Sequence, residues 1–517
     1  MTTAADPQPG LHAGGEGRVG MRSGALQAAM RNPWWTLPFI GLVAMLPLIV
    51  RRVGDPDYWW HVRTGQWMVD NGAFARHDLY TYTIAGAPWT DHEYLSQLLY
   101  YVLTRIGGLL AVSIFFGAAI WAGFLAVFAR IRQRTYAPFI AGAALLLGAG
   151  AGFPVWGPRP QMFDFIFGAI ELYWLERFLS GRSRGAWFLP VLIVPWANLH
   201  GGFVFGFFFL GLAIVAVLVR WIVERDRLHL RAVRALLLIA LASGLAALLT
   251  PYGPSLYQYV WKTQFSSQLS GFVREWQSPD FHALNMLPFG LMLLLVLTGF
   301  TWRRPQLHDA LFVAGSAVLA LRAWLFIPMF VAAATPVLAW QWSEPWVRLR
   351  TWLKTTPVGR PREWAGEGLL MLAGLALVGG IGVSAYTLRG QTTATRANYP
   401  VAAADWLAAH PTVGTRMFNE YAWGGYLAYR FYPTPTRRVF IYGESELMGD
   451  TLLAQYADVN NLRSDWSKIL DEYRVDYVVF PTDTPLVSAL DISPAWQRVY
   501  SDSMAVIFVR NGTTPTG

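Results

Sequence analysis

Residues 55–61 read DPDYWWH and residues 89–95 read WTDHEYL, and both segments belong to the polar loop 51–107 that follows the first long apolar run. The loop holds two acidic clusters, so it is too polar to lie in lipid, and its tryptophans are typical of a membrane–water interface. We therefore expect it to form surface helices on the membrane, with the rest of the chain arranged around them.

The composition is that of a polytopic membrane protein. Of 517 residues, 54% are hydrophobic, only 14% are charged, and 25 are tryptophans. The absence of cysteine excludes disulfides, thiolate catalysis and cysteine-based metal centres. The net charge of +9 comes from Arg clusters between apolar runs, as membrane topology requires, so we expect no nucleic-acid partner.

Apolar runs predict about eleven transmembrane helices. They lie near residues 34–50, 108–129, 137–153, 161–179, 186–198, 203–221, 235–250, 285–301, 308–321, 325–340 and 367–388. Together they define a predicted transmembrane domain over residues 34–388. Residues 1–33 are Gly-rich and predict a disordered cytoplasmic tail, followed by an uncleaved anchor rather than a signal peptide.

The distribution of basic residues predicts the orientation. Loops on the side of the N-terminus hold roughly 21 Lys and Arg, against roughly 9 on the other side before residue 389. The N-terminus is therefore expected in the cytoplasm, with the loop 51–107 and the C-terminal region outside.

The composition changes near residue 389, where charged residues return and short β-rich runs alternate with helical ones. Residues 400–410 and 466–473 predict helices, whereas 437–443, 475–481 and 504–510 predict strands. We expect an extracytoplasmic α/β domain over residues 389–517.

Most of the unusual polar residues fall on the predicted outer side, where residues distant in sequence meet at one membrane face. They are Asp55, Asp57, His61, Asp91, His92, Glu93, Arg159, Gln161, Asn198, His200, Arg274, Glu275, Asp280 and Arg322. Because charges near lipid are costly, we interpret them as a functional cluster. The alternative is that outer loops hold polar residues in any case.

The acidic pair of DPDYWWH has a structural and a chemical interpretation. Asp55 is a good helix N-cap with Pro56 at the first helical position. Asp57 lies one turn before His61 on the expected helix 58–69, so this carboxylate and imidazole share a face. They could share a proton, a metal or a substrate hydroxyl there. Trp60 either anchors the helix at the interface or stacks on a sugar ring.

The segment 90–93 reads TDHE, which has the spacing of a capping box. That motif accounts for Glu93 as a helix cap before a helix over 93–104, and it leaves Asp91 and His92 free to face the site. His200 precedes two glycines, which permit close approach of either a substrate or a neighbouring helix.

Two arginines lie at outer helix ends. Arg159 and Arg322 either snorkel to the interface or bind a lipid phosphate through their planar guanidinium groups. Asp164, one turn into a predicted span, is expected to face the bundle and to pair with one of these arginines.

The loop motifs, the number of spans and the terminal α/β region resemble the GT-C superfamily of integral-membrane glycosyltransferases. Within it, the chain is similar to bacterial multi-spanning proteins whose first outer loop reads D-x-D-x-W-W-H, followed by W-x-x-H-E-aromatic-L. The resemblance implies a sugar donor on a polyprenyl phosphate, transfer at the outer leaflet of a bacterial inner membrane, and Asp55 or Asp57 as base or metal ligand.

The favoured hypothesis is therefore a hexosyl- or pentosyltransferase of cell-envelope glycan assembly. Asp57 or Asp55, with His61, would act on an acceptor hydroxyl of a glycan, lipid or protein, while Arg159, Arg322 or His200 stabilises the leaving phosphate. Asp55 and Asp57 would hold Mg or Mn if a metal takes part. The remaining substrate-binding candidates are Trp60, Asp91, His92 and Glu93.

Two other functions remain open on the sequence: a flippase or transporter of lipid-linked glycans, and a non-catalytic receptor or assembly protein. A transporter predicts polar residues through the membrane depth, whereas here they collect outside. No Walker A, HExxH or GxSxG motif occurs, so we expect no nucleotide, flavin or haem.

Overall fold

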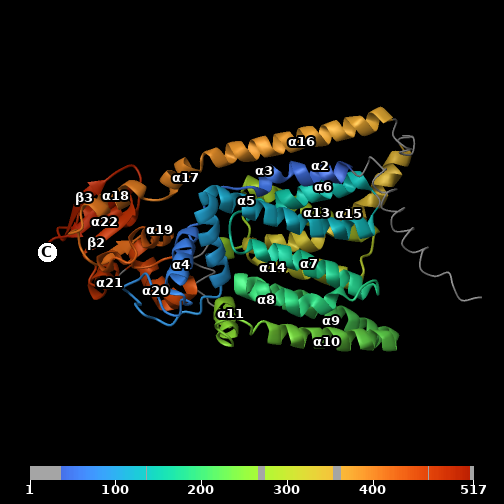
Figure 1. The fold of residues 1–517 in the computed structure, drawn as a ribbon, viewed down its shortest axis with the longest axis horizontal. Helices are drawn as coiled ribbons and strands as arrows, with labels where there is room; N and C mark the ends of the chain where they lie inside the picture. Colours follow the sequence, from blue (N-terminus) through green and yellow to red (C-terminus); the bar gives the residue numbers. More distant parts are fainter. Residues whose placement is uncertain (1–35, 136, 266–273, 353–362, 464, 513–517) are drawn as a thin grey trace, which may run out of the picture.

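The computed structural model describes residues 36–135, 137–265, 274–352, 363–463 and 465–512. A bundle of long helices forms one end of the molecule and a small α/β region forms the other, with the polar loop between them (Figure 1). The predicted tail over residues 1–33 lies outside the described residues.

Each predicted apolar stretch coincides with a helix. The bundle contains α2 (Thr36–Ala44), α3 (Leu46–Ile49), α5 (Tyr94–Arg134), α6 (Pro138–Ala151), α7 (Met162–Leu179), α8 (Leu189–Leu199), α9 (Val204–Glu224), α10 (Arg227–Ala246), α13 (Leu287–Trp302), α14 (Leu307–Arg322), α15 (Ile327–Trp352) and α16 (Glu363–Arg389). Within the described residues, six helices are long and apolar enough to cross a membrane, and shorter apolar helices accompany them. The chain is a multi-pass integral membrane protein.

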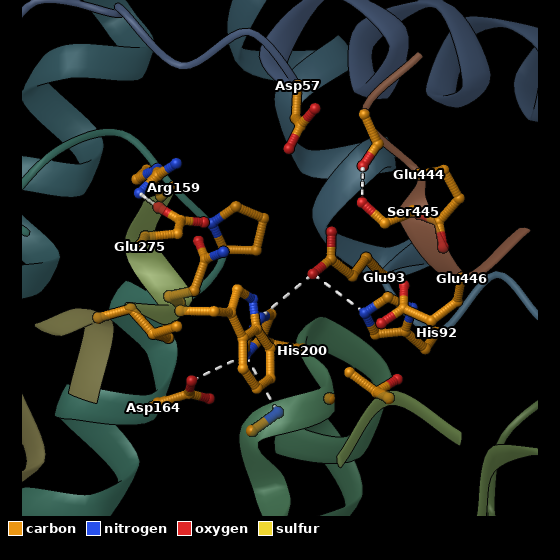
Figure 2. Close-up of a pocket in the computed structure, with 18 of the residues that line it drawn as sticks. Asp57, His92, Glu93, Arg159, Asp164, His200, Glu275, Glu444, Ser445 and Glu446 are labelled. Carbon is orange, nitrogen blue, oxygen red and sulfur yellow. Dashed lines mark hydrogen bonds and ion pairs between the residues drawn. The ribbon is translucent and has the colours of Figure 1, made fainter. Parts of the chain in front are cut away.

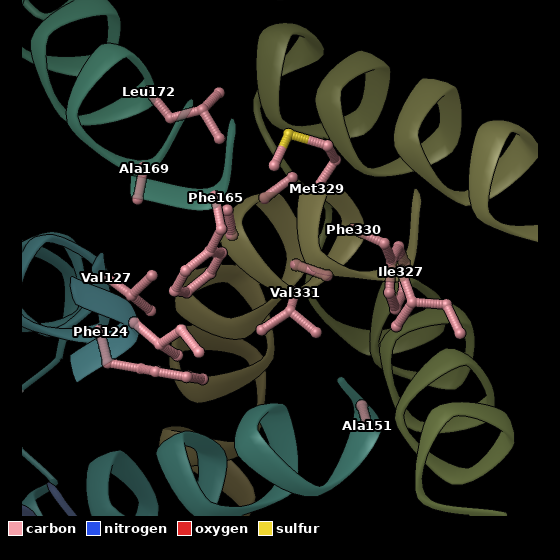
Figure 3. Packing of buried hydrophobic residues seen from close by; sticks show 14 of the residues in the cluster. Phe124, Val127, Ala151, Phe165, Ala169, Leu172, Ile327, Met329, Phe330 and Val331 are labelled. Carbon is pink, nitrogen blue, oxygen red and sulfur yellow. The ribbon is translucent and has the colours of Figure 1, made fainter. Parts of the chain in front are cut away.

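The bundle is built around α15. Of its most apolar window, 83% is buried inside the protein, whereas only 17% of the corresponding window of α16 is. Met329 and Val331 of α15 lie toward Phe165 and Ala169 of α7 in the core, whereas Phe330 points away and packs on Phe289 of α13 (Figure 3). By contrast, α16 runs along the outside of the bundle, where its apolar side chains are available to lipid (Figure 1).

The predicted surface helix and the predicted span that follows it are both present. The helix over 93–104 and the span over 108–129 are the two parts of α5, which is broken by non-helical backbone at Gly107 and Gly108. Gly108 has φ +61°, a conformation that glycine adopts without strain. The bend lets the first part of α5 pack on α4 (Tyr58–Asn71) outside the bundle.

The C-terminal region contains a mixed four-stranded sheet in the order β1-β2-β4-β3. Its strands are β1 (Met417–Asn419), β2 (Tyr477–Pro481), β3 (Trp496–Ser501) and β4 (Ala505–Arg510). β1 pairs in parallel with β2, while β4 is antiparallel to both β2 and β3.

The C-terminal region also contains the helices α17 (Gln391–Asn398), α18 (Val401–Ala409), α19 (Tyr421–Phe431), α20 (Ser445–Asn460), α21 (Trp466–Glu472) and α22 (Pro485–Asp491) and the 3-10 turn η7 (Pro435–Arg437). The connections between the bundle helices contain α11 (Ser255–Phe265) and the 3-10 turns η2 (Gly185–Phe188), η3 (Gly201–Phe203), η4 (Arg274–Trp276), η5 (Leu284–Met286) and η6 (Trp324–Phe326). The predicted strands 475–481 and 504–510 and the predicted helices 400–410 and 466–473 are confirmed.

The prediction of a strand over 437–443 was wrong. Arg437 belongs to the 3-10 turn η7, and the buried residues 439–442 form only an isolated bridge between Val439 and Thr81 of the polar loop. The Val439 amide donates to the Tyr80 carbonyl at 3.1 Å, and the Tyr82 amide donates to the Val439 carbonyl at 3.3 Å. The segment therefore fastens the C-terminal region to the loop instead of extending the sheet.

A shared hydrophobic core joins the polar loop to the α/β region. Trp60, Tyr80 and Trp89 of the loop are buried in the same cluster as the sheet residues. Gly425 makes this contact possible, because a Cβ there would lie 2.9 Å from both the Pro56 carbonyl oxygen and the Trp60 ring. The loop is thus held between the bundle and the α/β region.

Candidate active site

A cavity of about 640 Å³ lies where the bundle, the polar loop and the α/β region meet. Its polar part is lined mainly by acidic and histidine side chains (Figure 2). Its apolar part is formed by side chains of α9, α14 and the η6 turn, namely Val204, Phe205, Phe208, Leu319, Leu325 and Phe326. The cavity therefore offers a polar compartment next to an apolar one at one end of the bundle.

Arg159 holds two buried carboxylates at one side of the cavity. Its Nε atom donates to Asp55 Oδ2 at 2.6 Å, and its Nη1 atom donates to Glu275 Oε2 at 2.5 Å. Asp55 also accepts the Asp57 amide through Oδ1 at 3.0 Å. The arginine thus fixes the turn that places Asp57, because a buried ion pair with further hydrogen bonds has a defined geometry.

Asp57 precedes the first residue of α4 and points its carboxylate into the cavity (Figure 2). Trp60 Nε1 donates to Asp57 Oδ1 at 3.0 Å. Burial, followed by the negative charge of Asp55, raises the pKa of Asp57 to about 8. A carboxylate with such a pKa is suited to accept a proton near neutral pH.

Glu93 lies at the centre of three histidines. Its carboxylate oxygens are 3.2 Å from His61 Nε2, 3.1 Å from His92 Nε2 and 3.3 Å from His200 Nε2. Burial alone would raise the pKa of Glu93, but the charge and hydrogen bonds of the histidines outweigh it and lower this pKa to about 2. Glu93 is therefore an anion that orients three imidazoles.

The three histidines are not equivalent. Burial lowers the pKa of His61 to about 4, so its imidazole is neutral at pH 7. His200 lies between Glu93 and Asp164, with Nδ1 at 2.8 Å from Asp164 Oδ2. Burial would lower the pKa of His200 as well, but Asp164 and then Glu93 raise it to about 9. His200 is the cationic imidazole of the cavity at neutral pH.

Most predicted site residues line this one cavity. They are Asp55, Asp57, Trp60, His61, His92, Glu93, Arg159 and His200. Two predicted residues lie elsewhere: Asp91 is buried against Gln97, whose Nε2 donates to Asp91 Oδ1 at 2.6 Å, and Arg322 is exposed at the end of α14. Neither is among the lining residues.

Two expectations about individual side chains were wrong. Glu93 is at the N-cap position of α5, but its side chain makes no capping hydrogen bond, because both oxygens contact histidines. Asp164 pairs with His200 and accepts from Trp196 Nε1 at 2.8 Å rather than binding an arginine. For Arg159, the sequence left snorkelling and the binding of a lipid phosphate open, and the structure pairs it with Asp55 and Glu275.

The sequence interpretation missed residues of the C-terminal region and of α11. Tyr259, Tyr421, Glu444, Ser445 and Glu446 all line the cavity. Glu444 and Glu446 directly follow the buried run 439–442, and an acidic pair at the end of such a run is the only local signal. Glu275 was recognised as an outer polar residue but not as part of the site.

The predicted metal site at Asp55 and Asp57 is not supported by the available donor atoms. Both oxygens of Asp55 already have partners, one of them a guanidinium group that a cation would have to displace. Among the residues that the structure describes, no group of three or more His, Asp or Glu side chains could hold a metal ion. These residues do not form a Mg or Mn site by themselves, so a metal requirement stays a prediction.

Comparison with solved structures identifies the fold. An oligosaccharyltransferase from Archaeoglobus fulgidus, tethered with an acceptor peptide that contains the NVT sequon, matches 92% of this chain and 74% of its own, with a TM-score of 0.56 and 12% identity. The archaeal oligosaccharyltransferase AglB from the same organism, in complex with an inhibitory peptide and a dolichol-phosphate, matches 93% of this chain and 75% of its own, with a TM-score of 0.52 and 14% identity. The chain has the fold of the GT-C membrane glycosyltransferases.

A weaker likeness is to ArnT from Cupriavidus metallidurans bound to undecaprenyl phosphate, with a TM-score of 0.48 and 13% identity over 91% of this chain and 96% of that one. No protein-family model matches the sequence, and neither does any curated protein. The GT-C fold is therefore known from the three-dimensional arrangement and not from overall sequence similarity.

Proposed function

We propose that the protein is a glycosyltransferase that moves a sugar from a polyprenyl-phosphate donor to an acceptor hydroxyl on the outer face of the membrane. The observation that carries this proposal is the position of Asp57, a half-buried carboxylate that points into a cavity with one polar and one apolar part. A lipid-linked sugar also has two parts, a polar sugar phosphate and an apolar lipid chain. The GT-C fold and the dolichol-phosphate named for the archaeal oligosaccharyltransferase AglB support the same choice.

Asp57 acts as the general base in this proposal. It accepts the proton of the acceptor hydroxyl while that oxygen forms a bond to the anomeric carbon of the donor. The bond between the anomeric carbon and the phosphate oxygen breaks at the same time, and the polyprenyl phosphate leaves with the electron pair. Attack from the face opposite the leaving group inverts the configuration of the sugar.

His200 is the residue that we assign to the leaving phosphate. The pKa of His200 is about 9, so its imidazole stays protonated at neutral pH. The ring lies beside the apolar side chains with which α9 lines the cavity. A fixed positive charge at this position would stabilise the negative charge that develops on the phosphate oxygen. Arg159 instead positions Asp55, and through it Asp57, so its contribution is indirect.

The polar chemistry favours an enzyme over a transporter. The cavity carboxylates and histidines collect at one end of the bundle, and the central helix α15 is packed by apolar residues along its length. Four other buried charges of the bundle, Arg130, Arg134, Glu176 and Asp309, are bound to one another. Glu171 of α7 is the one buried acid between this network and the cavity among the described residues of that helix, whereas a transport path would need a continuous series of polar groups.

The experiment is release of free polyprenyl phosphate by the purified protein in nanodiscs. A panel of polyprenyl-phosphate and polyprenyl-pyrophosphate sugars should be offered with glycan, lipid and peptide acceptors, with and without Mg or Mn. We expect release from at least one monophosphate donor, together with an equal amount of glycosylated acceptor. Binding of these lipids with no release from any donor would contradict the proposal.

A further inference from the structure

The carboxylates that line the cavity fall into two groups. Seven acidic side chains contribute to the lining. Four of them have basic or imidazole partners: Asp55 and Glu275 on Arg159, Glu93 on three histidines, and Asp164 on His200. The other three, Asp57, Glu444 and Glu446, form no ion pair within the part of the chain that the structure describes.

These three carboxylates lie in one part of the cavity. Asp57 abuts Gly443 so closely that a Cβ at residue 443 would lie 1.6 Å from Asp57 Oδ1. Glu444 and Glu446 follow Gly443 at the start of α20, and Figure 2 places them on the side of the cavity away from Asp164. Glu446 Oε2 accepts from the hydroxyl of Tyr259 at 2.8 Å.

Glu444 is the side chain that this arrangement leaves unsatisfied. It is only 4% exposed, and its Oε1 atom has no hydrogen-bond partner. Burial, and after it the charges of Glu446 and Glu93, raise the pKa of Glu444 well above its usual range. A buried carboxyl group without a partner costs free energy, and a bound cation would recover that cost.

We infer that Glu444, assisted by Glu446, binds a protonated amino group on the polar part of the substrate, beside Asp57. This inference rests on the proposed function and specifies its substrate class. An ammonium group donates hydrogen bonds in three directions, so it can reach oxygens that do not converge on one point. A metal ion held by protein side chains alone needs several converging ligands, and no such set of three or more exists among the described His, Asp and Glu side chains, so the test below includes Mg.

The aromatic side chains near Glu444 fit the same ligand. Tyr259 stacks on His92 with ring centroids 4.1 Å apart, and its hydroxyl joins His92 to Glu446. The Tyr421 hydroxyl lies 2.6 Å from Ser445 Oγ. A small cation next to aromatic rings and a carboxyl group is stabilised by the rings and favours the ionised form of Glu444, whereas a neutral hydroxyl does neither.

The amino group can belong to the donor sugar or to the acceptor, and matched probes distinguish the two. In the donor arm, nanodisc-embedded protein is titrated with a polyprenyl phosphate that carries an amino sugar, and with its counterpart that has a hydroxyl at the same position. In the acceptor arm, the pair is a glycolipid with a free amino group and its N-acetylated form. Both arms are repeated with EDTA and with Mg, and with the Glu444→Gln variant.

We expect wild-type protein to bind the amine-bearing member of one pair at least about tenfold more tightly, with or without Mg. In Glu444→Gln this preference should fall to less than about threefold, and Glu446→Gln should reduce it by a smaller factor. Equal affinities for both members of both pairs in the wild type would overturn the inference without recourse to any variant. The inference would also be overturned if a folded Glu444→Gln protein kept the preference for the amine. A third contrary result would be Mg binding that depends on Glu444 without any preference for the amine.

The two proposals fail separately. If polyprenyl phosphate is released equally fast from amine-bearing and amine-free substrates, the glycosyltransferase function stands and the amine site is wrong. If the amine preference is measured in binding but no donor releases its lipid, the amine site stands and the transferase function is wrong.

Discussion

Asp57 Oδ1 occupies the space that a Cβ of residue 443 would need, at 1.6 Å from the ideal position of that atom. The two residues come from opposite ends of the chain, one from the polar loop and one from the α/β region. The C-terminal region therefore forms a wall of the site and touches the carboxylate to which we assign the chemistry.

Substitution of Gly443 by alanine should displace the Asp57 carboxylate. We expect Gly443→Ala to lower kcat/KM by about 100-fold, because a shift of about 1 Å in a reacting group costs a rate factor of this size. The matched control is Gly382→Ala on α16, where a Cβ would meet nothing within 4 Å. Equal activity of both variants would show that the contact with Gly443 does not position Asp57.

Loss of Arg159 should affect stability and activity together. Arg159→Ala leaves the buried Asp55 carboxylate without its cation, which costs about 3–5 kcal/mol in comparable buried pairs, and it also removes the partner of the half-buried Glu275. Arg159→Lys should recover only part of the loss. Lysine restores the positive charge, but its ammonium group cannot reproduce the two donor nitrogens of the planar guanidinium group. Thermal unfolding in detergent measures this effect.

The control for Arg159 is Arg348→Ala, which breaks an exposed pair with Glu344 on α15. Exposed pairs contribute about 1 kcal/mol or less, so its unfolding temperature should stay near that of the wild type. A change as large as that of Arg159→Ala would mean that burial does not decide the effect.

The rate should depend on pH in a bell-shaped manner. Asp57 is a base only when deprotonated, so activity should rise as the pH passes its pKa of about 8. His200 stabilises the phosphate only when protonated, so activity should fall as the pH passes about 9. We expect the maximum of kcat/KM between these values. A rate that is highest at pH 6 would contradict both assignments.

Stability should have its own pH dependence at Asp57. The folded-state pKa of Asp57 is raised above its unfolded value, so its burial weakens the fold increasingly as the pH rises from about 4 toward 8. Asp57→Asn removes this cost, and its unfolding temperature should equal or exceed that of the wild type at pH 8. A lower unfolding temperature for Asp57→Asn would indicate that the carboxylate is a structural group.

Glu93 should control the alkaline side of the pH profile through His200. Glu93→Gln removes one of the three carboxylates that raise the His200 pKa, so the alkaline limb should move down by about one pH unit. The amide can still accept a hydrogen bond, which keeps the geometry. An unchanged alkaline limb would mean that His200 is not the group that titrates there.

The part of the site that lies in the polar loop could be predicted from the sequence because its signals are local. Asp57 and His61 follow from a helix that starts at a DPD turn, and the aromatic residues around them place the segment at the interface. The apolar runs likewise predict the helices of the bundle. A helix that crosses a membrane needs a long apolar segment, and such a segment is recognised directly in the sequence.

Other parts depend on contacts between distant segments. The TDHE spacing indicates a helix cap for Glu93, but His61 and His200 reach it from separate elements and give it another role. The segment 439–442 has the pattern of a strand, yet it pairs with the loop instead of the sheet. Glu444 enters the cavity only because of that pairing, so no local pattern could assign it to the site.

The most direct measurement compares Asp57→Asn and Asp55→Asn in nanodiscs, with a donor that the wild-type protein uses. We predict that Asp57→Asn lowers the release of polyprenyl phosphate by at least about 1,000-fold while the protein stays folded and still binds the donor. Asp55→Asn should instead lower both stability and activity, because Arg159 loses one of its two partners. Wild-type rates of release from a folded Asp57→Asn protein would contradict the assignment of Asp57 as the base.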